Sequence, residues 1–262
     1  MYRWLAWFVL PAAICAQPVP PSAAERDRVL NRVGEFAREY IEHLPDFICL
    51  RETIHYTRTA EADAWKPQAK VGEELSFYAR EEHSRVVAVD DKPAKSLPRR
   101  WESRFVYSSG NFGYFLQAIF QGQLHATNKW KGWDTVSGRR AWAFSYRMPA
   151  GYGAESCRGI TVYRGVCENS NFPYHGLIEV AEDGSAVLRL TVEPEKPESN
   201  AWESRTIDYD RVAIAGVQYL LPVADTLFME IGNTDFRNQS VYRDYRKFTA
   251  ESVIKPAPGK ER

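Results

Sequence analysis

Alternating bulky and small side chains mark the clearest strand in this chain. Between residues 140 and 148, the bulky side chains fall on one face: Trp142, Phe144, Tyr146 and Met148. Smaller or more polar residues occupy the positions between them. Successive side chains of a strand point to opposite sides, so this period of two predicts a strand with one bulky face. Trp130 and Trp133, in the preceding run, extend the same aromatic group.

Similar runs predict about ten strands in all. They cover residues 47–57, 74–79, 84–89, 127–136, 140–148, 174–181, 186–193, 204–214, 218–228 and 238–254, with a polar loop over 59–70. Several of the connections are short and rich in turn residues, such as 137–138, 182–184 and 215–216. Connections of that length join antiparallel neighbours, so the pattern predicts hairpins.

Two segments change to helical spacing. Ser22 and Glu25 form a capping-box sequence, and apolar residues then recur every three or four positions until about His43. A shorter helix is predicted over residues 111–120, which are apolar on nearly all sides. A helix of that kind must be buried or must face a groove, where it would act as a lid.

These elements predict a mainly β (α+β) fold. We expect a single strongly curved antiparallel sheet, or half-barrel, with an N-terminal helix and a short internal helix, because a flat sheet of this size tends to curl. The expected domain spans residues 22–255. A stiff proline-rich linker over 17–21 precedes it, and a disordered tail over 256–262 follows.

The N-terminus has the pattern of a secretory signal peptide over residues 1–16. Arg3 provides a positive start, an apolar run follows, and small residues lead to expected cleavage after Ala16. Two alternatives stay open, an uncleaved anchor and a lipoprotein in which Cys15 carries the lipid. The expected location is the periplasm or the cell exterior.

The remaining cysteines agree with export. Cys157 and Cys167 flank a short segment with a glycine near each end, and in an oxidising compartment they are expected to form a disulfide. Two reduced, buried thiols are the alternative. Cys49 lies in an apolar run and is interpreted as a core residue. The cysteine and histidine spacings match no metal pattern, so no metal site is expected.

Charge and motifs restrict the possible functions. Lys and Arg number 34, as do Asp and Glu, so the net charge is zero and nucleic-acid binding is not expected. No catalytic motif is present, and we expect neither an enzyme nor a cofactor. A hydrolase with an unrecognised site is kept as an alternative, and Asp208 and His175 are the positions at which to test it.

The aromatic face has two interpretations, ordinary core or the lining of an apolar ligand site. On the second interpretation the short helix closes the site, and the ligand-binding residues are Phe112, Phe115, Phe120, Trp130, Trp133, Trp142, Phe144 and Tyr146. Apolar ligands require concave surfaces that exclude water.

The order of elements resembles the periplasmic lipoprotein carriers of the LolA and LolB type. The stretch from Glu179 to Leu190, a strand followed by an Asp-Gly turn and an apolar strand, is similar to their central hairpin, and Leu220-Leu221-Pro222 follows later. The strand from Tyr245 to Ile254 also resembles the end of related secreted bacterial proteins. The resemblance is one of pattern, covers about residues 22–254, and implies a fold that holds acyl chains in a concave sheet.

The function expected first is therefore binding or carriage of a lipid or lipidated chain in the cell envelope. The partners expected are that apolar ligand or an envelope protein, with peripheral contact with a membrane. The alternative is a structural or protein-interaction module that takes no small ligand.

Overall fold

The computed structural model describes residues 20–59, 61–62, 64–98, 111–120, 127–149, 173–195 and 201–248. These residues form one antiparallel sheet of eleven strands, in the order β4-β3-β2-β1-β11-β10-β9-β8-β7-β6-β5. The strands are β1 (Phe47–Thr59), β2 (Lys66–Tyr78), β3 (Glu81–Val89), β4 (Lys92–Pro93), β5 (Thr127–Val136), β6 (Arg139–Met148), β7 (Tyr174–Ala181), β8 (Val187–Pro194), β9 (Ala201–Ile214), β10 (Val217–Ile231) and β11 (Thr234–Lys247). The edge strands β4 and β5 do not pair with each other, so the sheet is curved but not closed.

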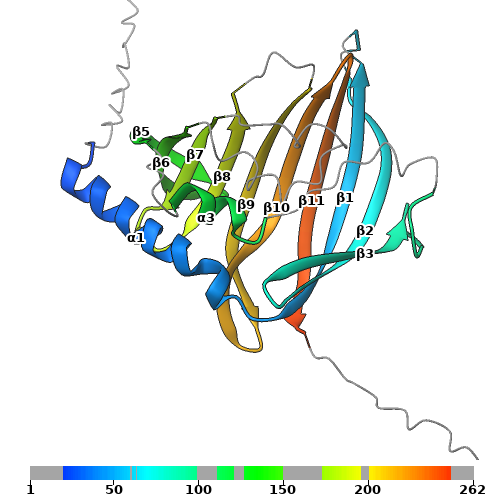
Figure 1. Cartoon of the computed structure of the whole chain (residues 1–262), viewed down its shortest axis with the longest axis horizontal. Coiled ribbons are helices and arrows are strands. Elements are labelled where there is room, and N and C mark those ends of the chain that lie inside the picture. Colours follow the sequence, from blue (N-terminus) through cyan, green and yellow to red (C-terminus); the bar gives the residue numbers. More distant parts are fainter. Residues whose placement is uncertain are drawn as a thin grey trace, which may run out of the picture.

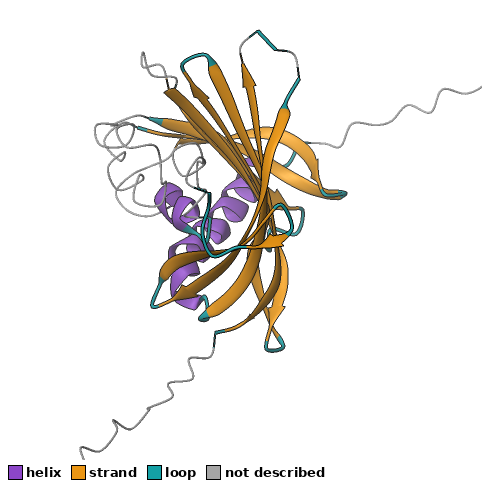
Figure 2. Cartoon of the chain, turned by 90° about the vertical axis from the view of Figure 1, so that its right-hand side faces the viewer, coloured by secondary structure: helices purple, strands orange, loops and turns teal. Residues whose placement is uncertain are grey.

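Two helices lie on the same face of the sheet, which curves around them (Figures 1 and 2). Helix α1 (Ala23–His43) begins with the expected capping box, in which Ser22 and Glu25 satisfy each other's backbone N–H groups. Helix α3 (Tyr114–Phe120) is short and packs beside α1. The predicted fold class is confirmed.

The largest apolar cluster lies between the helices and strands β6 to β10. Val33 and Ala37 of α1 and Leu116 of α3 are buried there against Ile178 and Leu190 of the sheet. A second cluster around Phe47 and Leu75 continues the apolar surface toward β1, β2 and β11. The helices therefore cover the apolar half of the sheet face that they contact.

The same face becomes polar farther across the sheet. Strand pairing aligns one row of residues from β2 to β5: Val71, Thr53, Ser240, Asp225, Ile207, Leu190, Ile178, Phe144 and Trp130. Its members on β1, β11 and β10 are polar and buried, and Thr53 and Ser240 share a hydrogen bond of 3.0 Å between their hydroxyl oxygens. Buried polar groups require such partners, so this part of the face is satisfied internally.

The predicted loop over residues 59–70 is wrong at its C-terminal end. Strand β2 begins at Lys66, because the backbone there pairs with the far end of β1, as in the pairing of Ala69 with His55. Pairing with β3 starts only at Val71, so Pro67 lies where β2 has a partner on one side alone, a position at which proline is tolerated. The strand expected from residue 238 begins earlier, at Thr234.

Candidate functional site

The structure places the predicted aromatic face beneath the two helices. Trp142, Phe144 and Tyr146 of β6 are all buried, and Phe144 has no exposed surface. Phe115 of α3 belongs to the same cluster. Tyr146 also donates a hydrogen bond of 2.9 Å from its hydroxyl to the Thr191 carbonyl oxygen. These side chains form the packed core under α1 and α3.

The tryptophans form a compact group at the edge of this core. Trp130 lies with its ring centroid 5.4 Å from that of Trp142, and Trp133 lies 4.7 Å from the same ring. Trp130 and Trp133 are half-buried, and the Arg140 guanidinium stacks 3.8 Å from the centre of the Trp133 ring. Aromatic groups of this kind stabilise a sheet edge through both packing and cation–π attraction.

The three phenylalanines of the predicted lid separate. Phe115 packs in the main cluster, Phe120 packs at its margin, and Phe112 belongs to the neighbouring cluster around Phe47. The Phe112 ring is 5.1 Å from the Phe47 ring. The structure thus brings seven of the eight predicted residues to one cluster and places Phe112 in the next.

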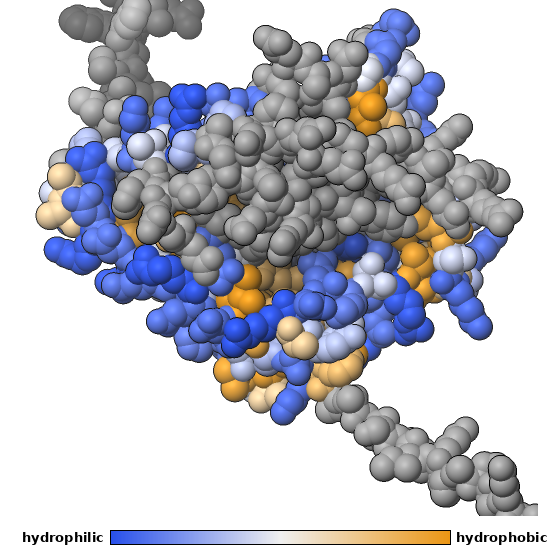
Figure 3. All heavy atoms as spheres, in the orientation of Figure 1, coloured by the Kyte–Doolittle hydropathy of each residue, from blue (hydrophilic) through white to orange (hydrophobic). Residues whose placement is uncertain are grey.

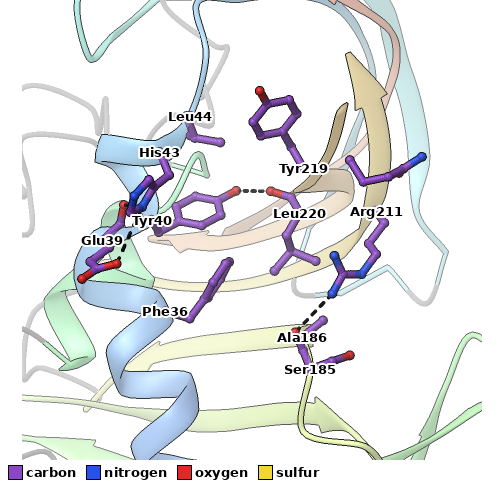
Figure 4. A pocket seen from close by; sticks show the side chains of 11 residues that line it. Phe36, Glu39, Tyr40, His43, Leu44, Ser185, Ala186, Arg211, Tyr219 and Leu220 are labelled. Atoms are coloured by element: carbon purple, nitrogen blue, oxygen red, sulfur yellow. Dashed lines mark hydrogen bonds and ion pairs between the residues drawn. The ribbon is translucent and has the colours of Figure 1, made fainter. Parts of the chain in front are cut away.

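A pocket of about 350 Å³ lies beside this core, between the C-terminal half of α1 and the hairpin of β9 and β10 (Figure 4). We call it the helix–hairpin pocket. Its lining consists of Phe36, Glu39, Tyr40, His43, Leu44, Ser185, Ala186, Arg211, Gln218, Tyr219 and Leu220. Hydrophobic atoms also reach the surface along the lower rim of this side of the molecule, among hydrophilic ones (Figure 3).

The walls of the helix–hairpin pocket are mainly apolar. Phe36 and Tyr40 project from α1 toward Leu220, whereas Glu39 and His43 point away from it (Figure 4). The Tyr40 hydroxyl donates a buried hydrogen bond of 2.6 Å to the Leu220 carbonyl oxygen and so fixes the depth of the helix against the hairpin. Burial raises the pKa of Tyr40 well above its ordinary value, so the hydroxyl stays a donor.

Phe36 is the unusual member of this wall. It is large and apolar, yet 37% of its surface is exposed. Its neighbours Val33, Ala37 and Tyr40 on the same helix are buried. The apolar stripe of α1 is therefore wider than the sheet beneath it can cover. The uncovered part opens into the helix–hairpin pocket.

A second cavity of about 620 Å³ adjoins the first and shares Ser185, Ala186, Arg211 and Leu220 with it. Arginines and carboxylates line much of the remainder. Arg139 contacts Asp210 at 3.2 Å, and Arg140 contacts Glu182 at 2.8 Å. The two spaces together run from an apolar end at α1 to a charged end at the start of β6.

A buried polar network holds the segment before α3 against the sheet. The Asn111 side chain donates to the Tyr242 hydroxyl at 2.7 Å and accepts from Arg205 at 3.1 Å. Tyr242 in turn donates to Asp225 at 2.7 Å. The sequence pattern gave no sign of this network, because its members are scattered over four segments.

The remaining candidates have ordinary structural partners. Asp208 forms an ion pair with Arg189 at 2.5 Å, and His175 contacts Glu193 at 3.4 Å. Cys49 is buried, as expected, and burial raises the pKa of its thiol to about 12. Cys157 and Cys167 lie outside the described residues, as does the segment 1–16.

Phe36 and Tyr40 belong to the helical stripe predicted up to about His43, but the sequence did not indicate them, Arg211 or Leu220 as site residues. The only sequence signal for this site was the width of the apolar stripe on α1. The strands that the stripe contacts depend on pairing between distant segments, so the sequence pattern did not indicate them. Within the part of the chain that the structure describes, no group of three or more His, Cys, Asp or Glu side chains is arranged to hold a metal ion.

Comparison with solved structures finds matches over most of the chain. The structure resembles that of a LolA superfamily protein. That protein, from Nitrosomonas europaea, is 12% identical, with 84% of this chain and 94% of that chain covered and a TM-score of 0.40. A DUF1329 family protein from Desulfovibrio piger is 10% identical, with 86% and 95% covered and a TM-score of 0.41. A lipoprotein-sorting protein domain, described as putative, from Vibrio parahaemolyticus is 10% identical, with 86% and 93% covered and a TM-score of 0.37.

A LolA superfamily protein is thus among the solved structures that this chain resembles, as expected from the order of elements. No protein-family model matches the sequence, and no curated protein sequence does either. In the described part of the chain, neither helix is both long and apolar enough to cross a bilayer.

Proposed function

We propose that this protein binds an apolar ligand, or the apolar part of a larger one, in the helix–hairpin pocket. The observation that carries the proposal is the half-exposed apolar wall at Phe36, which faces Leu220 across a pocket of about 350 Å³. Small-molecule sites are typically concave, mainly apolar and about 300–1,000 Å³ in volume.

The position of the pocket supports the proposal. Three of its lining residues, Tyr40, Ala186 and Leu220, belong to the main buried cluster, so this part of the wall is held by close packing. At its side, the Tyr40–Leu220 hydrogen bond holds the helix at a fixed distance from the hairpin. A ligand that enters covers the exposed part of Phe36 and gains the free energy of apolar burial.

The export signal expected at residues 1–16 completes the proposal. We propose that the ligand is met in the cell envelope, where lipids or lipidated chains are the available apolar cargo. The sequence-based expectation that the protein is not an enzyme is retained in this proposal.

Displacement of an uncharged fluorescent probe, N-phenyl-1-naphthylamine, by decanol tests the site. We expect saturable displacement by the wild-type protein and about tenfold weaker binding by Phe36→Ala, which removes roughly 1.4 kcal/mol of apolar contact. Tyr78→Ala is the matched control, because Tyr78 is a similarly exposed aromatic residue on β2, at 38% against 37%. Absence of displacement by the folded wild-type protein would overturn the proposal.

Trp142→Ala separates this site from the aromatic face predicted by the sequence. If ligand lies in the helix–hairpin pocket, Trp142→Ala lowers stability but leaves the affinity of the folded fraction within about twofold. If Trp142→Ala loses ligand affinity and Phe36→Ala keeps it, the ligand binds at the aromatic cluster. The proposal that it binds in the helix–hairpin pocket would then be wrong.

A further inference from the structure

We infer that the ligand is an anionic amphiphile with one hydrocarbon chain, and that Arg211 binds its carboxylate. The inference rests on the proposed function and adds the chemical class of the ligand. It follows from the location of Arg211, from the pairing of the charges around it and from the size of the apolar pocket.

Arg211 stands where the two cavities meet. It lines both of them, and its side chain faces the Phe36 and Tyr40 wall from the opposite side of the helix–hairpin pocket (Figure 4). A molecule whose chain lies between Phe36 and Leu220 therefore has its far end beside a guanidinium group. This is the arrangement that an amphiphile needs, with an apolar end enclosed and a charged end near water.

The other arginines of the adjoining cavity are already neutralised. Asp210 pairs with Arg139, and Glu182 pairs with Arg140. Among the described residues, no carboxylate is in ion-pair contact with Arg211, whose side chain donates one long hydrogen bond of 3.4 Å to the Ser185 carbonyl oxygen. The guanidinium carries five N–H donors, so most of them stay available to a ligand oxygen.

The acidic groups nearby do not remove this positive charge. Asp183 has a pKa below its ordinary value chiefly because Ser185 donates hydrogen bonds to it, with a smaller contribution from the Arg211 charge. Its carboxylate accepts the Ser185 backbone N–H at 2.9 Å. Glu39 lies on the α1 side of the pocket, where its carboxylate is 3.8 Å from His43 (Figure 4). The uncompensated cation at the junction is thus Arg211.

Size and geometry favour a single chain with a carboxylate. A cavity of about 150 Å³ holds one benzene ring, so the 350 Å³ of the pocket fits a chain of medium length better than a two-chain lipid. Guanidinium and carboxylate groups match as a planar, two-bond pair, which makes a carboxylate the most suitable head group for an arginine.

Decanoate and decanol form the test pair, because they differ in the charged head group and share the chain length. With the wild-type protein at pH 7.5, we expect decanoate to displace N-phenyl-1-naphthylamine about tenfold more tightly than decanol. Arg211→Gln is expected to abolish that difference, mainly by weakening displacement by decanoate, while Arg211→Lys keeps part of it. Arg85→Gln, on the distant strand β3, is the control and is expected to preserve the full difference.

The outcomes separate the inference from the proposed function. If neither compound displaces the probe, the proposed function fails. If decanol binds and decanoate binds no more tightly, the inference of an anionic ligand is overturned and the proposed function stands. The same holds if Arg211→Gln leaves the preference for decanoate intact. Binding to vesicles that contain anionic lipid, without displacement by free decanoate, would also overturn it and would point to a membrane surface.

Discussion

At the scale of single residues, burial of carboxylates inside the sheet is the most informative feature. Glu73 accepts hydrogen bonds from Arg51 at 2.8 and 3.0 Å, so this buried charge has a counterion. Glu179, on the sheet face opposite the helices, is 3% exposed and lies close to the Asp134 carboxyl group, while the Arg189 guanidinium is 4.0 Å from its carboxylate. Burial and the neighbouring carboxyl group both favour the protonated form of Glu179 and so raise its pKa.

The protonation of Glu179 predicts a dependence of stability on pH. Burial and Asp134 raise its pKa from 4.5 to about 7. Because the folded-state pKa is the higher one, the stabilisation is complete below about pH 4.5 and is lost as the pH rises through 7. We expect the wild-type free energy of unfolding to fall, by up to about 1.4 kcal/mol per pH unit, between pH 5 and 7 relative to Glu179→Gln.

Urea denaturation of both proteins at a series of pH values measures this difference. The control is Glu182→Gln, because Glu182 is largely exposed and makes one surface ion pair with Arg140. Parallel pH profiles for the wild-type protein and Glu179→Gln would show that Glu179 is ionised throughout this range.

At the scale of elements, the approach of α3 to α1 decides how the apolar face is covered. Asn111 is anchored to the sheet by Tyr242 and Arg205, and the chain then turns at Gly113, which has a φ of +97°. A β-carbon at Gly113 would lie 2.0 Å from an atom of the Tyr40 ring. Glycine is thus required there for both backbone conformation and space.

Gly113→Ala is expected to lower the free energy of unfolding by several kcal/mol. This loss is expected to be at least about twice the loss caused by Gly138→Ala. Both glycines have positive φ, but nothing lies within 4 Å of a β-carbon at Gly138. The control therefore reports backbone strain alone, roughly 1–2 kcal/mol, while Gly113→Ala adds a steric clash with Tyr40. Urea midpoints measure both, and equal losses would contradict the close approach of α3 to α1.

At the scale of the whole molecule, the predicted signal peptide and the predicted disulfide can both be tested on the expressed protein. If residues 1–16 direct export, the protein recovered from the periplasm of an expressing bacterium begins at Gln17. If Cys157 and Cys167 are bonded, the denatured mature chain reacts with iodoacetamide at Cys49 alone, and Cys49→Ser does not react. Intact-mass analysis measures both, and three modified cysteines would refute the disulfide.

The sequence by itself determined the local elements and the fold class. Strands 127–136 and 174–181 match their predicted bounds, because alternation and turn residues act over short distances. The tertiary structure decided which faces meet. Pairing of β1 with β11 and the placement of α1 over β6 to β10 made the aromatic strand into core and left Phe36 uncovered beside Arg211. Such contacts join residues far apart in the chain, and no local pattern of apolar and polar positions encodes them.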